Sequence, residues 1–178
     1  MRIRLVLPFL LAAHILTTGS SLGQINPGDI RDDLLNQFNA SASKVVQLSE
    51  AIPAELYAWA PGEGVMSIAT VYAHIARYNY MYLAENVGVA IPRGVEYANL
   101  EDLTNKDDIV TVLEESIEYA RIAIRALSDD DLLRHTTLYG RDVAVWSVLV
   151  QLVSHMNEHV GQSVAYARIN GVVPPWSS

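Results

Sequence analysis

The sequence of 178 residues contains no cysteine. Disulfides therefore cannot stabilise the fold, and its stability has to come from the packing of a hydrophobic core. Hydrophobic residues make up 51% of the chain, which is enough for one core, and the length is typical of one domain. Without thiolates, any bound metal ion must have nitrogen and oxygen ligands.

Basic residues are scarce, with 12 Lys and Arg against 20 Asp and Glu, and the net charge is −8. An acidic surface repels a phosphate backbone, so the composition argues against nucleic-acid binding. The sequence also lacks a Ser-His-Asp spacing, a phosphate-binding glycine loop and a haem attachment motif. No residue is therefore assigned a catalytic role from a motif.

The chain begins with a short apolar run from Leu5 to Ile15, preceded by Arg2 and Arg4. A membrane-spanning helix needs about 20 apolar residues, so this run is too short. The small-x-small pattern Ser21-Leu22-Gly23 follows it, and this order is typical of a secretory signal peptide. The alternative interpretation is a buried first helix.

We predict a signal peptide at residues 1–23 and an exported domain, periplasmic or secreted, at residues 24–178. Cleavage would remove two basic residues and no acidic one, which takes the net charge from −8 to −10. We expect no stable membrane span in the mature protein.

Apolar residues then recur every three or four positions in four segments, which predicts four long amphipathic helices. The first begins at the capping pair Asn26-Pro27 and ends before Pro53. The second begins after Ser67, the third after Thr104 or Asn105, and the last covers about residues 146–169. A short helical turn is expected after Ser128, and residues 135–145 form either an irregular loop or a small hairpin.

The segment from Ile91 to Asn105 is a long connection without clear periodicity. A helical bundle needs such a crossover when consecutive helices are not antiparallel neighbours. The sequence therefore predicts an all-α fold, a four-helix bundle with a crossover between its second and third helices.

The last helix contains His155 and His159, four residues apart and therefore on the same face. They continue the row of Val148 and Leu152, so both are expected to point into the bundle. His74 continues the apolar face of the second helix in the same way.

Three inward histidines on two neighbouring helices can bind one divalent ion and leave a coordination position open. Zn²⁺ fits this ligand set best, with Ni²⁺ or Fe²⁺ as alternatives. The competing interpretation is that His74, His155 and His159 are hydrogen-bonded core residues, because a single inward histidine is more often structural than a ligand.

Four other residues are interpreted without a role as metal ligands. Glu158 is expected at its rim, where it could contact a ligand histidine, and Tyr78 is expected to pack in the bundle. His135 is interpreted as a surface histidine, and His14 belongs to the predicted signal peptide.

Three segments give the sequence a resemblance to the DinB-like family of metalloenzymes. They are residues 60–67 leading into Ala73-His74-Ile75-Ala76, residues 155–162 with the sequence HMNEHVGQ, and the tail of residues 166–177. The resemblance implies an up-down-down-up four-helix bundle and a divalent metal ion bound by His74, His155 and His159. It also implies a homodimer and, in some relatives, thiol-dependent transferase or isomerase activity.

The functional hypothesis is an exported metal-dependent enzyme that acts on a small-molecule substrate. Its metal ion would activate a water, as in a hydrolase, or a thiol, as in a thiol transferase. Export favours hydrolysis, since low-molecular-weight thiols are mainly cytosolic. The alternatives are a non-catalytic bundle that binds a metal ion or a small molecule, and a purely structural bundle.

Overall fold

The structure is a computed structural model that describes residues 26–177. The predicted signal peptide lies outside the described residues. Four long helices form the bundle: α1 (Pro27–Ala51), α2 (Ile68–Met81), α3 (Lys106–Ala126) and α5 (Val145–Ile169). The shorter elements are η1 (Ala54–Leu56), η2 (Tyr82–Val87), η3 (Tyr97–Asp102), α4 (Asp129–Leu133), β1 (His135–Leu138), β2 (Arg141–Ala144) and η4 (Pro175–Ser177).

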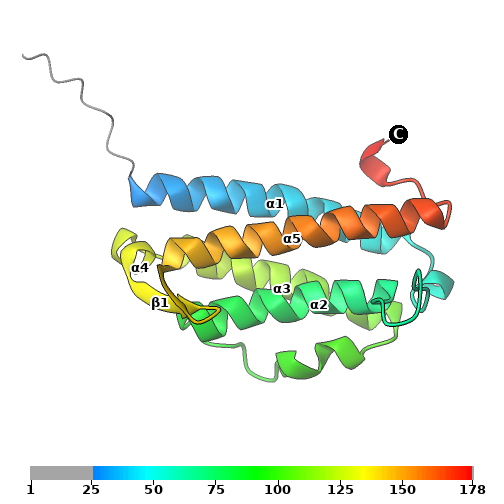
Figure 1. The fold of residues 1–178 in the computed structure, drawn as a ribbon, viewed down its shortest axis with the longest axis horizontal. Coiled ribbons are helices and arrows are strands. Elements are labelled where there is room, and N and C mark those ends of the chain that lie inside the picture. Colours follow the sequence, from blue (N-terminus) through cyan, green and yellow to red (C-terminus); the bar gives the residue numbers. More distant parts are fainter. Residues whose placement is uncertain (1–25, 178) are drawn as a thin grey trace, which may run out of the picture.

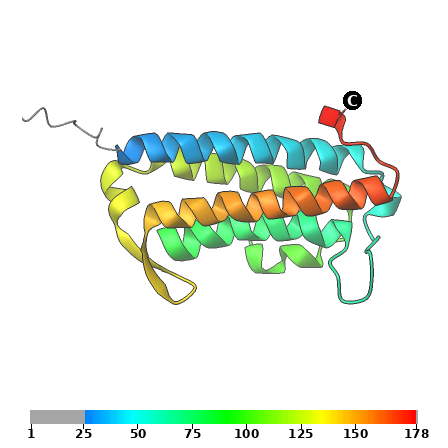
Figure 2. The ribbon, with the colours of Figure 1, turned by 45° about the horizontal axis from the view of Figure 1, so that its top comes forward.

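The long helices are arranged up, down, down and up (Figure 1). In this view α1 and α5 run from left to right, and α2 and α3 run from right to left. The parallel pair α2 and α3 requires the chain to return along the whole bundle, and residues 88–105 make this return. The turned view shows the same arrangement, with η3 lying outside the bundle against α2 (Figure 2). The predicted fold is confirmed.

Side-chain caps fix where the helices begin. The Asn26 side chain accepts a hydrogen bond from the backbone of Gly28, and Ser67 accepts one from Thr70. Asn105 caps α3 by accepting from two backbone amides, which decides between the two predicted caps. Each cap satisfies a backbone amide that has no partner within its helix.

The core lies between the four helices. Each contributes side chains with no exposed surface, including Phe38 from α1, Ile75 from α2, Leu113 from α3 and Leu152 from α5. The apolar stripes predicted from the sequence are therefore the faces that meet. No helix in residues 26–177 is long and apolar enough to cross a membrane.

Two segments add detail that the sequence left open. The second helix continues as the π-helical segment η2, which ends at Gly88 with a φ of 86°. Residues 135–144 form an antiparallel hairpin, not an irregular loop. Tyr139 and Gly140 both have positive φ values at its turn, as a tight two-residue hairpin requires. The backbone of β1 is tied to η2, because Asn86 donates to the carbonyl of Thr137 at 2.7 Å.

Candidate metal centre

His155 and His159 lie one turn apart on α5 and point into the bundle, as predicted. Their exposed fractions are only 7% and 6%. Both belong to the face of α5 that buries Val148 and Leu152, so the helix repeat alone directs them inward. The buried face of α5 thus places two imidazole rings next to each other inside the bundle.

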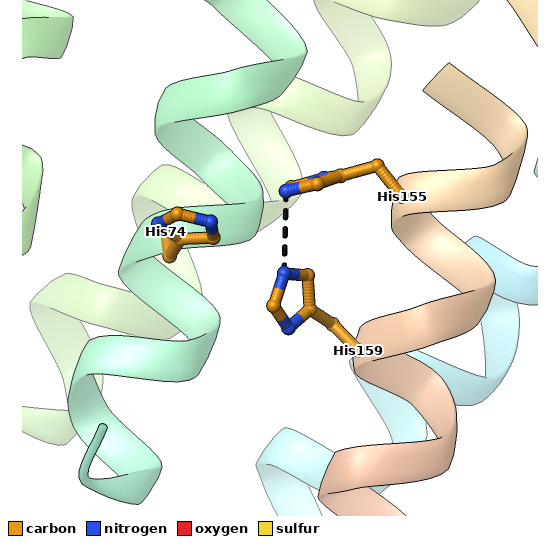
Figure 3. A group of neighbouring side chains, drawn as sticks. All are labelled: His74, His155 and His159. Carbon is orange, nitrogen blue, oxygen red and sulfur yellow. Dashed lines mark hydrogen bonds between the residues drawn. The ribbon is translucent and has the colours of Figure 1, made fainter. Parts of the chain in front are cut away.

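His74 lies on α2, which packs beside α5, and its ring meets the other two (Figure 3). The ring centroid of His74 is 5.1 Å from that of His155 and 4.9 Å from that of His159. Within residues 26–177, one potential ligand nitrogen from each of these three histidines lies within 4.8 Å of the other two. The structure therefore brings together all three histidines predicted from the sequence.

The nitrogen spacing suits a metal ion. The Nε2 atoms of His155 and His159 lie 3.2 Å apart and point toward each other (Figure 3). Two nitrogens bound to one zinc ion at 2.0–2.1 Å with tetrahedral geometry are about 3.3 Å apart. The α5 pair therefore already has the separation that a shared ion requires, and a ring nitrogen of His74 lies within 4.8 Å of both.

Two hydrogen bonds orient the rings from outside. Glu101 Oε1 lies 2.8 Å from Nδ1 of His74, and Gln162 Oε1 lies 2.7 Å from Nδ1 of His159. The Gln162 amide nitrogen also donates to the Tyr166 hydroxyl at 2.9 Å, and in this orientation the amide oxygen faces His159. With Nδ1 occupied as a donor, the lone pair of each ring is at Nε2 and available to a metal ion.

Burial favours the neutral form of His74 and His155, and only neutral imidazole binds a metal ion. Burial is the main reason that the pKa of His155 falls to about 3, and the nearby His159 and His74 lower it further. Burial also lowers the pKa of His74, although its hydrogen bond to Glu101 acts in the opposite direction. The site therefore favours the ligand form of these side chains at neutral pH.

Tyrosine rings surround the His155 side of the site. Tyr78 stacks on His155 with a centroid distance of 4.7 Å and also contacts His74 at 4.3 Å. Tyr82 meets His155 edge-on at 5.8 Å, and its hydroxyl is hydrogen-bonded to that of Tyr139 at the hairpin turn. Tyr78 thus packs against the rings, as expected, and the hairpin reaches the edge of the site through Tyr139 and Tyr82.

Glu158 does not make the contact to a ligand histidine that its expected position at the rim would allow. Its side chain is exposed and takes part in no hydrogen bond or ion pair among residues 26–177. It lies about 100° around α5 from His159. The carboxylate next to a site histidine is that of Glu101, in the crossover. His135 is a surface residue as predicted, with a 74% exposed side chain next to Asp142.

Glu101 could not be predicted as a site residue because no local sequence pattern marks it. It is 27 positions away from His74, on the short helix η3 in a segment without periodicity. Gln162 carried a usable signal, since it lies one turn after His159 on the same helix face.

Solved structures of several bacterial proteins share this fold. The chain aligns over 81% of its length with 95% of a DinB-like protein from Bacillus cereus, with a TM-score of 0.71 and 18% identity. For the DinB-like protein YjoA of Bacillus subtilis the TM-score is 0.63 at 20% identity, over 79% of this chain and 93% of that one.

YfiT from Bacillus subtilis, described as a probable metal-dependent hydrolase with an unusual four-helix bundle topology, has a TM-score of 0.61 at 15% identity over 80% of this chain and 89% of YfiT. A mycothiol-dependent maleylpyruvate isomerase has a TM-score of 0.59 at 19% identity. The match covers 78% of this chain but 62% of the isomerase.

At these identities the structural likeness shows the shared fold. No curated protein sequence matches the chain. The family assignment comes from the sequence itself, since the model of the DinB superfamily matches residues 37–163, which is more than half of the chain. This range contains α2, most of α5 and all three histidines, and the chain belongs to the DinB superfamily.

Proposed function

We propose that this protein is a metal-dependent enzyme in which His74, His155 and His159 bind one divalent ion, with Zn²⁺ as the first candidate. The observation that carries the proposal is the convergence of three ring nitrogens within 4.8 Å between α2 and α5. Three protein ligands suit a catalytic rather than a structural zinc site, because the fourth position is left for water or substrate.

The residues fit the ion in charge state as well as in geometry. Low pKa values keep His74 and His155 neutral, and Glu101 and Gln162 direct the Nε2 atoms of two rings toward the centre. A divalent ion held there would supply a Lewis acid that lowers the pKa of a bound water or thiol. Tyr78 and Tyr82 would shield one side of the centre from solvent.

We propose hydrolysis of a small molecule as the reaction class. YfiT, which has the same fold, is described as a probable metal-dependent hydrolase. In addition, a signal peptide at residues 1–23 would place the protein away from the cytosolic thiol pool. The second candidate is a thiol-dependent isomerase or transferase. It is favoured by the fold shared with the mycothiol-dependent maleylpyruvate isomerase.

The proposal is tested by the metal content of the purified protein after exposure to Zn²⁺ and removal of loosely bound ions. We expect one ion per chain in the wild type and a large loss in His155→Ala and His74→Ala. His135→Ala is the matched control, because it removes an exposed histidine elsewhere on the protein and should retain the ion.

Absence of bound metal in the wild type, or full occupancy in both site variants, would refute the metal centre. Activity panels with hydrolase substrates and with thiol cosubstrates then separate the two reaction classes. A loaded protein that turns over neither class would favour a non-catalytic binding bundle.

A further inference from the structure

We propose that Glu101 is a positioning residue for the metal centre, and that the crossover between α2 and α3 is therefore part of the site. Its carboxylate holds the His74 ring with a proton on Nδ1 and the lone pair on Nε2, and Arg77 holds the carboxylate in place. The inference rests on the proposed function, because it concerns how His74 is presented to the ion.

The hydrogen bond between Glu101 and His74 sets the tautomer. The two atoms are 2.8 Å apart, which is within the range of a charge-assisted bond. An ionised carboxylate can only accept, so the proton lies on Nδ1 and Nε2 is left unprotonated. A neutral imidazole without such a partner can carry its proton on either nitrogen, and a protonated Nε2 cannot bind a metal ion.

Arg77 restrains the carboxylate. Its Nη1 atom lies 3.1 Å from the same oxygen of Glu101 that contacts His74. Arg77 follows His74 by three residues, so the two side chains lie on the same face of α2. Both contact Glu101 of η3. Two side chains, His74 and Arg77, thus hold the Glu101 carboxylate in place. The positive charge of Arg77 offsets the desolvation cost of the partly buried carboxylate.

The crossover is also tied to the bundle beside Glu101. The Tyr97 hydroxyl at the start of η3 donates to Glu85 on η2 at 2.9 Å. Leu103, just after η3, packs against the hydrophobic core. Because η3 is held at both ends, Glu101 keeps a fixed position beside α2. A carboxylate in a fixed position can orient the His74 ring.

The histidines of the site differ in the hydrogen-bond partners of their Nδ1 atoms. Gln162 gives His159 a neutral acceptor, whereas Glu101 gives His74 a charged one. Among residues 26–177, Glu101 is the one carboxylate hydrogen-bonded to a ring of the site. A carboxylate partner strengthens the electron donation of an imidazole to the ion, and its loss typically weakens metal affinity by about 10–100-fold.

The first test uses metal-free protein and therefore does not depend on metal binding. Nitrogen-15 NMR of the histidine rings distinguishes the two tautomers, and the His74 signals are identified by their loss in His74→Ala. We expect the Nδ1-protonated form in the wild type and in Glu101→Gln, whose amide oxygen can still accept. Glu101→Ala should show a mixture of both forms. An Nε2-protonated His74 in the wild type, or a tautomer unchanged in Glu101→Ala, would overturn the proposal.

The second test measures zinc affinity for the same variants. Glu101→Ala should bind about 10–100-fold more weakly than the wild type, with Glu101→Gln between the two. Asp102→Asn is the matched control, since it removes the same charge from the next residue of η3 and should bind as the wild type does.

Equal affinities for the wild type and Glu101→Ala, or an equal loss in Asp102→Asn, would also overturn the proposal. A wild type that binds no zinc would instead refute the proposed function, while the tautomer measurement still decides the role of Glu101.

Discussion

Acidification should destabilise the metal-free protein through His155, and the size of this effect can be estimated from the structure. Burial lowers the pKa of the folded-state imidazole from 6.5 to about 3. Between these two values the unfolded chain binds a proton at this position that the folded protein does not bind. The free energy of unfolding therefore falls as the pH falls through this window.

A difference of one bound proton changes the free energy of unfolding by at most about 1.4 kcal/mol per pH unit. The contribution of His155 is complete above pH 6.5 and decreases toward about pH 3. His74 acts in the same direction, because its pKa is also lowered. A typical domain is stable by only about 5–15 kcal/mol, so two such groups would have a measurable effect.

The assay is urea unfolding in the presence of a chelator at several pH values from neutral to acidic. His155→Gln cannot take up the proton, so its stability should fall less steeply than that of the wild type. Carboxylates titrate in both proteins and cancel in the comparison. Identical pH slopes for wild type and variant would refute the conclusion that His155 is buried in its neutral form.

Three further outcomes are expected. Gln162→Leu should weaken zinc affinity about 10-fold or more in calorimetric titration, because Nδ1 of His159 loses its acceptor; unchanged affinity would contradict this role. Ser116→Ala should lower the free energy of unfolding by about 1–3 kcal/mol, because the buried Asn79 amide loses the partner it has at 3.0 Å; a change within experimental error would contradict this. Expression with residues 1–23 intact should give a processed protein in the exported fraction, as mass spectrometry would show, and an uncleaved cytoplasmic product would refute the signal peptide.

The bundle could be predicted because its signals are local. Capping residues such as Ser67 indicate where the helices begin, and the spacing of apolar residues predicts which helix faces are buried. The direction of His155 and His159 follows from the same spacing, since a residue four positions after an inward residue also points inward. His74 could be placed on the same basis.

What could not be predicted depends on contacts between distant segments. Glu101 reaches His74 only because the crossover packs along α2, and no local periodicity encodes that packing. The same limit applies to Glu158, which is adjacent to His159 in sequence but is exposed and contacts no histidine of the site. The π-helical continuation of α2 at Tyr82 also had no signal in the apolar pattern.

The central claim is that three imidazoles bind one ion, and X-ray absorption spectroscopy of the zinc-loaded protein tests it most directly. We expect one zinc ion per chain with three imidazole nitrogens at about 2.0–2.1 Å and one further light ligand from water or substrate. A protein that takes up no zinc, or a spectrum with fewer than three imidazole ligands, would contradict the assignment of His74, His155 and His159.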